Sequence, residues 1–434
     1  MTLQKRRVTN LLLLALPVFL FFNLSFVAAL WWWYRGLPPE NTINAHISLF
    51  TIMHLSWLVI FYLFQLLDLR TYRGWQWIYR LVWAMGLSMI VGAFIFYLQP
   101  NLLVTPRRML AVHVVLSSGL TLLWGAAATW AMGKRRPLHI LFMGVDTVAT
   151  ERFSELANQQ RFSIRCTHVS SSHQAPLDEF AARKPDILCL SSTLPEGYEH
   201  LIEEARKERV PIYTYTDLYE EFLRRIAVGE LHSWSRPNSS PFMHLHLIIK
   251  RLTDITIGLL LGLVVLVTAP IIVPLIKLSS EGPIFFLQRR VTLDGKPFTI
   301  YKYRTMRTDT DSSTWTQKKD PRVTRIGGLL RRSHLDEIPQ AWNLIKGDLS
   351  LVGPRPEQVV IVEELKKRIP FYAHRHHIRS GLTGWAQLQG YAGTVRGSQD
   401  KLEFDLYYLK HQSLLFDLEI ILKTLRSLAG LSGR

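Results

Sequence analysis

Apolar residues dominate four long stretches in the N-terminal third of the chain, with polar and basic residues between them. The stretches run from about Asn10 to Tyr34, Ala45 to Leu67, Gln76 to Leu98 and Met109 to Trp130. Each contains the roughly 20 residues that a helix needs to cross the hydrocarbon core of a bilayer. Tryptophan and tyrosine stand at the ends of the first and third stretches, which is typical of positions at a membrane surface. The pattern therefore predicts a membrane α-helical bundle of four transmembrane helices in residues 1–136.

Lysine and arginine flank these stretches unevenly, and such residues favour the cytoplasmic side of a membrane. They are concentrated before the first stretch, between the second and third, and after the fourth, at Lys5 to Arg7, Arg70 and Arg73, and Lys134 to Arg136. The other two loops hold Arg35 and the pair Arg107-Arg108, a weaker excess. We therefore expect a multi-pass membrane protein with both ends of the bundle in the cytoplasm and with its first helix retained.

From Leu138 onward, short apolar segments alternate with helix-like ones. Strand-like segments cover about 139–143, 162–168, 187–190 and 212–215, with a helix-like segment near 151–160. This alternation predicts a parallel sheet, and hence an α/β Rossmann-like module in residues 137–232. The loop from Gly144 to Ala149 lacks the repeated glycines that let a pyrophosphate approach the backbone. We therefore interpret the module as a regulatory or assembly domain, followed by a linker in residues 233–246.

A fifth apolar run, Ile255 to Ile276, contains Pro270 and Pro274 and has basic residues on both sides. Proline inside a helix removes a hydrogen bond and clashes with the preceding turn. We therefore expect a re-entrant membrane helix in residues 247–279, broken at Ala269-Pro270, with both ends on the cytoplasmic side. The alternative is a transmembrane helix with a proline kink, which would put everything after it outside the cytoplasm.

The charge balance restricts the partners of the protein. The chain has 434 residues, of which 48% are hydrophobic, and 51 lysines and arginines against 34 acidic residues give a net charge of +17. Such a surplus suits nucleic acid, anionic lipid or a phosphorylated substrate. The charge alone does not choose among these partners; we expect no nucleic acid partner. The two cysteines, Cys166 and Cys189, support neither a disulfide framework nor a zinc site.

The remaining residues, 280–434, read as an α+β catalytic domain. Two strand-like segments, 283–290 and 298–304, end in cationic residues that include Lys302 and Arg304. A predicted helix from Ser333 to Asp348 then carries the adjacent carboxylates Asp336 and Glu337 near its start. Carboxylates at that position commonly complement the helix dipole, so by themselves they do not indicate catalysis.

The segment after this helix changes the interpretation. Pro354 and Pro356 stiffen the backbone around Arg355, and an arginine fixed in this way presents its planar fork to phosphate oxygens. A carboxylate nucleophile near fixed guanidinium groups and a divalent cation is what phosphoryl transfer through an acyl phosphate requires. Mg²⁺ is the expected cofactor, because a diphosphate and a few carboxylates supply the oxygen ligands that it prefers.

Four motifs, Lys302 to Met306, Asp336 to Gln340, Lys346 to Glu357 and Gly381 to Gln387, together resemble the bacterial sugar transferase family. These are monotopic polyprenyl-phosphate phosphoglycosyl transferases, and the resemblance covers about residues 245–434. The complete layout is similar to the large subgroup of undecaprenyl-phosphate glucose phosphotransferases with N-terminal transmembrane helices. The resemblance implies transfer of a hexose-1-phosphate from a UDP-sugar to undecaprenyl phosphate, with release of UMP, at the start of exopolysaccharide, O-antigen or capsule synthesis.

The resemblance also assigns roles to residues. Asp336 is implied to be the nucleophile, which forms a covalent phosphosugar intermediate, and a magnesium ligand, while Glu337 orients the metal or handles a proton. The substrate-binding residues are Arg355, with Lys302 and Arg304 as supporting cations, and Arg379, which precedes Ser380-Gly381 where relatives commonly have proline. The proline-containing break of the family's re-entrant helix matches Ala269-Pro270. The implied location is the bacterial inner membrane with a cytoplasmic catalytic domain; glucose is the favoured sugar, galactose is next, and a homodimer is plausible.

Two other functions are compatible with parts of the pattern. A glycosyltransferase that releases UDP would use an acidic metal-binding motif, and Asp309-Thr310-Asp311 has that form. A non-catalytic scaffold could bind lipid-linked sugars, and it would retain its function when Asp336 is replaced by asparagine. The histidines His374, His376 and His377 are interpreted as a basic stretch near anionic headgroups, because no carboxylate stands at metal-ligand spacing.

Overall fold

The computed structural model describes residues 3–36, 40–64, 66–67, 76–97, 107–133, 137–159, 164–169, 176–191, 198–231, 243–307, 320–389 and 395–428. The chain divides into two compact units, Met1–Leu223 with Leu431–Arg434, and Arg224–Gly430. The first unit holds the N-terminal helices and the sheet module, and the second holds the carboxylate motifs.

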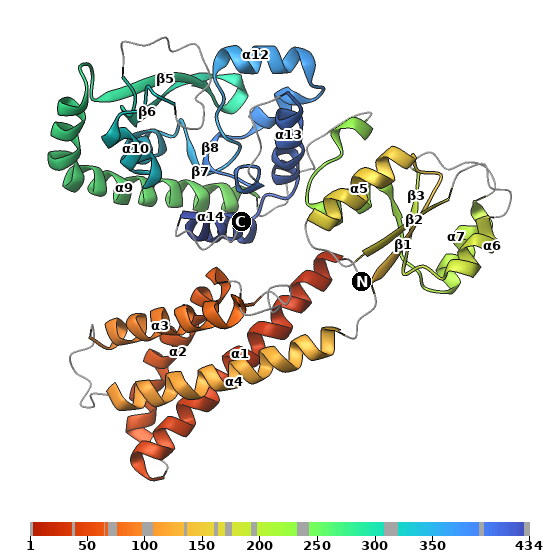
Figure 1. Cartoon of the computed structure of the whole chain (residues 1–434), viewed down its shortest axis with the longest axis horizontal. Helices are drawn as coiled ribbons and strands as arrows, with labels where there is room; N and C mark the ends of the chain where they lie inside the picture. The colour runs from red at the N-terminus through yellow and green to blue at the C-terminus, as the bar shows by residue number, and fades with distance from the viewer. Residues whose placement is uncertain are drawn as a thin grey trace. The chain divides into compact units, whose positions relative to one another are not determined.

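The N-terminal helices are α1 (Leu3–Tyr34), α2 (Glu40–Leu63), α3 (Gln76–Tyr97) and α4 (Arg107–Gly133), as Figure 1 shows in red to orange. They match the four predicted stretches and enclose an aromatic core that contains Phe22, Trp57 and Phe61. Within the described residues, four helices have a segment long and apolar enough to cross a membrane: α1, α3, α4 and a later helix, α9. The searched part of α2, Phe50–Leu63, is apolar but shorter. Large apolar side chains such as Ile90 and Leu123 point outward, as lipid-facing residues do.

The middle module is a four-stranded parallel sheet with the strand order β2-β1-β3-β4. Its strands are β1 (Leu138–Met143), β2 (Ile164–Val169), β3 (Ile187–Leu190) and β4 (Ile212–Thr214). They alternate with α5 (Thr147–Gln159), α6 (Pro176–Arg183), α7 (Glu199–Lys207) and α8 (Tyr215–Leu223). Figure 1 shows α5 on one face of the sheet and α6 and α7 on the other. The predicted parallel sheet is confirmed by the parallel pairing of all four strands. β3 is buried along its whole length, as expected for a strand covered on both faces.

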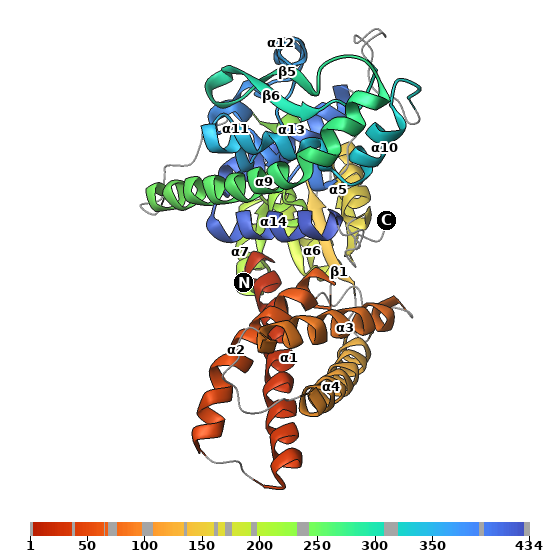
Figure 2. The ribbon, with the colours of Figure 1, turned by 90° about the vertical axis from the view of Figure 1, so that its left-hand side faces the viewer.

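Helix α9 (Met243–Ser279) is the longest element of the second unit. The sequence predicts a break at Ala269-Pro270, but the helix is continuous through both Pro270 and Pro274. Figures 1 and 2 show that α9 bends along its length instead of ending. A proline removes one hydrogen bond and crowds the preceding turn, and this distortion can be absorbed as a bend when the rest of the helix is held by packing.

Both halves of α9 pack against the same folded body. Before the prolines, Ile257 and Leu261 lie against a cluster that includes Ile300 and Leu344. After the prolines, Ile272 and Ile276 are buried against a cluster that includes Tyr303 and Leu330. The side chains that point away from the body are large and apolar, among them Leu259, Leu263, Leu266, Val267 and Ile271. Both halves of the apolar run therefore contact the body of the second unit.

The body itself is built from short elements. An antiparallel pair, β5 (Phe285–Val291) and β6 (Pro297–Tyr303), is followed by α10 (Arg325–Arg332), the 3₁₀ helix η4 (Leu335–Gln340) and α11 (Ala341–Lys346). The strands β7 (Ser350–Val352) and β8 (Gly381–Thr383) pair in parallel, with α12 (Val359–Arg368) and η5 (Tyr372–His377) between them. The chain continues through η6 (Gln387–Gln389), α13 (Val395–Lys410) and α14 (Leu414–Leu428).

Two details differ from the sequence expectations. The helix predicted from Ser333 to Asp348 is divided into η4 and α11, because Pro339 lies in the 3₁₀ turn and lacks the N–H that a regular helix uses. The predicted middle module extends to residue 232, whereas Arg224 onward belongs to the second unit, where Ile226 and Val228 join the core.

Helix α14 buries Phe416 and Ile420 and exposes Leu415 and Leu418, so it packs on the body with one face.

Candidate active site

The two adjacent carboxylates lie on η4, directly after a sharp turn. Helix α10 ends at Arg332, and His334 takes a left-handed conformation with φ of 56° before η4 begins. This turn directs η4 against strand β6, where Lys302 is located. The ammonium nitrogen of Lys302 lies 2.6 Å from Oε1 of Glu337, although the two residues are 35 positions apart in the sequence.

Arg355 approaches the same carboxylate from the loop after β7. Its Nη2 lies 3.5 Å from Oε1 of Glu337. The backbone of this loop is held at two points, because Arg375 donates to the carbonyl oxygen of Arg355 at 3.0 Å and Arg290 donates to that of Pro356 at 2.7 Å. The side chain of Arg355 is 45% exposed, so its guanidinium group contacts Glu337 and still faces solvent. A ligand phosphate could therefore reach it.

The two carboxylates have opposite electrostatic environments. Burial opposes ionisation of Glu337, but Lys302 and Arg355 outweigh it and lower the pKa of Glu337 to about 2. The pKa of Asp336 is raised instead, first by burial and then by the negative charge of Glu337, against the partial compensation of Lys302 and Arg331. Within the described part of the chain, no side chain forms an ion pair or hydrogen bond with Asp336. Glu337 is thus bound to cations, while Asp336 is available.

Two of the predicted substrate-binding residues lie elsewhere. Arg304 is 4% exposed, and its Nη2 donates to the carbonyl oxygens of Ser280 at 2.6 Å and Ile276 at 3.3 Å. It therefore stabilises the C-terminal end of α9, where carbonyl groups lack helical partners, and does not join the carboxylates. Arg379 is exposed, beside the Gly353 loop, and no contact of its side chain links it to Glu337. The pair Ala269-Pro270 lies within α9, in the membrane-type segment.

Three further residues belong to the site although the sequence did not indicate them. Arg331 donates from Nε to the Thr305 hydroxyl at 2.9 Å and contributes positive potential at Asp336. His334, at the turn before η4, acts to lower the pKa of both Asp336 and Glu337. Gln387 accepts a hydrogen bond from Nη1 of Arg355 at 3.3 Å. Each lies in or beside a motif segment, but its contact depends on the folded backbone.

A divalent cation would find a small set of protein ligands here. No three His, Cys, Asp or Glu side chains gather at metal-ligand spacing within the described residues. Magnesium commonly uses one or two carboxylates and completes its coordination with water and phosphate oxygens. Asp336 fits this requirement, because it has no cationic partner of its own and a cation beside it would favour its ionised form. Asp309-Thr310-Asp311, the motif of the UDP-releasing alternative, lies outside the described residues.

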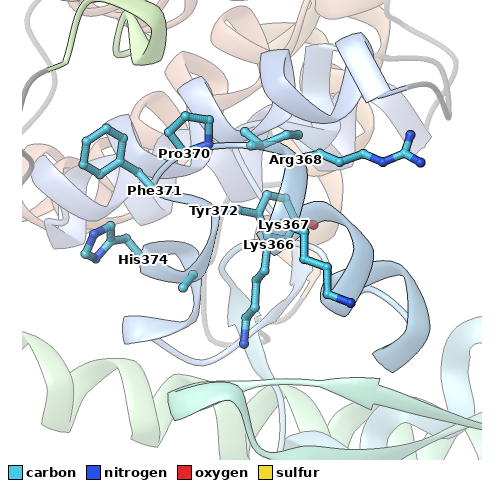
Figure 3. Close-up of a pocket in the computed structure, with 9 residues that line it drawn as sticks. Lys366, Lys367, Arg368, Pro370, Phe371, Tyr372 and His374 are labelled. Carbon is cyan, nitrogen blue, oxygen red and sulfur yellow. The ribbon is translucent and has the colours of Figure 1, made fainter.

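A separate pocket lies after α12, lined by residues 366–374 (Figure 3). Lys366, Lys367 and Arg368 end α12, where positive side chains complement the helix dipole. The ring of His374 stacks on that of Phe371 with centroids 5.9 Å apart, and burial lowers its pKa. Burial and then the charge of Arg375 lower the pKa of His376 to about 3. Both histidines are therefore neutral at pH 7, and the stretch is less basic than its sequence suggests.

Comparison with known proteins gives a match in the second unit. Residues 245–430 match the family described as bacterial sugar transferase. A UDP-N-acetylgalactosamine-undecaprenyl-phosphate N-acetylgalactosaminephosphotransferase from Aeromonas hydrophila is 36% identical over 248 residues, which are 55% of this chain and 57% of the relative. A UDP-glucose:undecaprenyl-phosphate glucose-1-phosphate transferase from Escherichia coli is 38% identical over 190 residues, or 43% of this chain and 41% of the relative.

A third relative is much shorter. The uncharacterized sugar transferase EpsL of Bacillus subtilis is 38% identical over 187 residues, which are 43% of this chain but 90% of that protein. The matched region therefore corresponds to nearly a whole protein in one relative. Of the two longer relatives, by contrast, the chain spans only about half the length.

Proposed function

The chain belongs to the bacterial sugar transferase family, and from this premise we propose that it transfers a hexose-1-phosphate from a UDP-sugar to undecaprenyl phosphate and releases UMP. The printed names of the Aeromonas and Escherichia coli relatives describe this type of reaction. The observation that carries the proposal is the division of the carboxylate pair. Glu337 is ion-paired with Lys302 and Arg355, while Asp336 beside it has no partner in the described structure.

This division suits covalent catalysis by Asp336. A carboxylate that is half-buried and unpaired is a better nucleophile than one held by two cations, because it gives up fewer interactions when it forms a bond. An oxygen of Asp336 attacks the sugar-bearing phosphorus of the UDP-sugar, the bond from this phosphorus to the bridging oxygen breaks, and UMP leaves with that oxygen. A phosphate oxygen of undecaprenyl phosphate then attacks the same phosphorus, and the acyl-phosphate bond breaks. The products are undecaprenyl diphosphosugar and regenerated Asp336.

The basic residues around Asp336 and Glu337 bind or position the phosphate groups of the substrate. Arg355 has a fork held by its loop and a face open to solvent, so it can bind a diphosphate oxygen without losing its contact with Glu337. Lys302 keeps Glu337 ionised, and the resulting negative charge orients both Arg355 and the lysine. We assign Arg304 to structural support of α9, and we assign no contact to Arg379.

We propose Mg²⁺ as the cofactor, held by Asp336 and by phosphate oxygens of the substrate. When bound, it would neutralise negative charge that the leaving UMP accumulates. The residues of the chain then have separate tasks: Asp336 reacts, Arg355 positions the diphosphate, and Lys302 fixes Glu337 beside them.

We further propose that α9 enters one leaflet of the bacterial inner membrane and returns, which leaves the catalytic unit in the cytoplasm. The return of α9 to the same folded body, on both sides of Pro270, supports this path over a crossing helix. A cysteine added after Arg434 should resist a membrane-impermeant thiol reagent in intact cells and react after lysis. Labelling in intact cells would contradict the re-entrant path. We propose glucose as the sugar, with galactose as the next candidate, and a homodimer as the assembly.

The central test is nucleotide release by the purified full chain with undecaprenyl phosphate, Mg²⁺ and a panel of UDP-sugars. We expect UMP, and we expect Asp336→Asn to reduce its release by about 10³-fold or more, since the nucleophile is removed. Asp294→Asn is the matched control, because Asp294 is exposed in the turn after β5 at φ of 56°, a conformation that asparagine also tolerates.

The alternatives give different results in the same assay. Release of UDP would identify a glycosyltransferase that moves the sugar alone. Full function of Asp336→Asn in cells would identify a scaffold. A UDP-sugar labelled with ³²P in the sugar-bearing phosphate should label the wild-type protein when lipid is omitted, and it should leave Asp336→Asn unlabelled.

A further inference from the structure

Residues 224–231 connect the sheet module to the second unit, and they are built into its core. The side chain of Arg225 is 2% exposed and forms ion pairs with Glu403 and Asp400. The backbone N–H of Ile226 donates to the carbonyl oxygen of Glu403 at 2.9 Å. This segment is therefore a fixed part of the transferase unit, and it begins directly after the last helix of the sheet module, α8.

Arg224, the first residue of the segment, is held from several sides. Its guanidinium group binds both carboxylate oxygens of Glu419, at 2.5 Å and 2.9 Å. The same group lies over the rings of Trp385 and Phe416, with 4.4 Å and 4.7 Å from Cζ to the ring centroids. The indole N–H of Trp385 donates to the carbonyl oxygen of Arg224 at 3.0 Å. Trp385 and Arg224 thus fix each other by stacking and by a hydrogen bond.

Trp385 lies in a turn that touches the Arg355 loop. At one end of the turn, a Cβ added to Gly384 would lie 2.1 Å from the carbonyl oxygen of Gly353, so the two backbones are in direct contact. At the other end, Gln387 accepts the hydrogen bond from Arg355. The turn therefore contacts both the backbone and the side chain of the loop that presents Arg355 to Glu337.

We propose that Gln387 and Trp385 are positioning residues for Arg355, and that Arg224 holds their turn in place. A change in the sheet module that pulled on Arg224 would then move the phosphate-binding arginine, which gives the module a route for regulating the transferase. The inference rests on the proposed function for the role of Arg355. The physical coupling from Arg224 to the Arg355 loop is independent of it.

The kinetic test is a double-mutant cycle in the full chain. Gln387→Ala should raise the KM for the UDP-sugar about 5- to 10-fold with kcat changed less than about 2-fold, since it removes one long, solvent-exposed hydrogen bond of Arg355. In an Arg355→Lys background, which loses the fork that reaches Gln387, the same change should alter KM less than about 2-fold. Equal effects in both backgrounds would overturn the proposal. Gln412→Ala is the matched control and should leave KM unchanged, because the Gln412 amide, in the turn before α14, donates to the carbonyl oxygen of Leu409 and not to the Arg355 loop.

The second test does not depend on activity. Trp385→Phe keeps a buried ring but removes the hydrogen bond to Arg224. Hydrogen exchange measured by mass spectrometry should become about 3- to 10-fold faster in peptides covering 224–231 and 351–358, a factor that matches the loss of one hydrogen bond. Peptides from β5 and β6 should be unchanged. Faster exchange confined to 224–231 would overturn the coupling, whereas a wild-type protein that releases no UMP would overturn the proposed function alone.

Discussion

Replacing Lys302 with methionine removes the ammonium group beside Glu337 and keeps an unbranched side chain of comparable bulk. In the wild-type protein, the ammonium nitrogen lies 2.6 Å from Oε1 of Glu337, and the two side chains are only 17% and 21% exposed. The second cation, Arg355, is more distant at 3.5 Å and is 45% exposed. The substitution therefore leaves a largely buried carboxylate with one weak partner.

The size of the effect follows from the pKa of Glu337. Its pKa is about 2 in the folded protein against an ordinary value of 4.5. This difference of about 2.5 pH units corresponds to about 3 kcal/mol, since one pH unit is worth roughly 1.4 kcal/mol. Lys302 is the larger of the two cationic causes, so we assign about 2 kcal/mol to it. For a unit of this size, the loss corresponds to a decrease in Tm of about 4–8 °C.

The dependence on pH separates this cause from simple loss of packing. A carboxyl group whose pKa is lower in the folded state stabilises the fold above its unfolded pKa, and the contribution is lost as the pH falls toward the folded pKa. For Glu337 the window runs from 4.5 down to about 2. The Tm difference between wild type and Lys302→Met should therefore be full at pH 7 and fall by about half at pH 3.

Differential scanning fluorimetry of the detergent-solubilised full chain at pH 7, 5, 4 and 3 would measure this difference. Lys346→Met is the control, because Lys346 pairs with Asp348 at 3.2 Å but is 59% exposed. An exposed pair contributes about 0–1 kcal/mol, so its loss should change Tm by no more than about 2–4 °C. A Tm difference for Lys302→Met that is equal at pH 7 and pH 3 would refute the assignment of stability to the Glu337 pair.

Three other predictions follow from the site. Gly327→Ala should destabilise the protein by about 2 kcal/mol or more in thermal denaturation, because its Cβ would lie 2.0 Å from the carbonyl oxygen of Thr305, whereas Gly328→Ala has 4.0 Å of space and should be tolerated. Burial and the charge of Glu337 raise the pKa of Asp336, so Glu337→Gln should move the acid limb of the pH–rate profile to lower pH, and an upward move would contradict this. EDTA should abolish UMP release and excess Mg²⁺ should restore it; full activity in EDTA would exclude the proposed cofactor.

Much of the fold follows from local patterns in the sequence. The four apolar stretches predict α1 to α4, because length and apolarity are sufficient to define a membrane helix. The alternation after Leu138 predicts the parallel sheet, and two strands were placed within two residues of β5 and β6. The motifs also lead to Asp336, Glu337, Lys302 and Arg355, three of which the structure brings into contact.

The tertiary structure alone decided which charges meet. Lys302 lies near the end of β6 and Arg304 directly follows that strand, and the two cations look equivalent in the sequence, yet Lys302 binds Glu337 and Arg304 caps the end of α9. The continuity of α9 through its prolines and the contact of Gln387 with Arg355 could not be predicted from the sequence either. The physical reason is that helix and strand patterns depend on neighbours a few positions away, whereas an ion pair depends on where distant backbone segments are placed by packing. The sequence by itself therefore determined the elements and the candidate chemistry, and packing determined that Glu337 is bound to cations while Asp336 remains available.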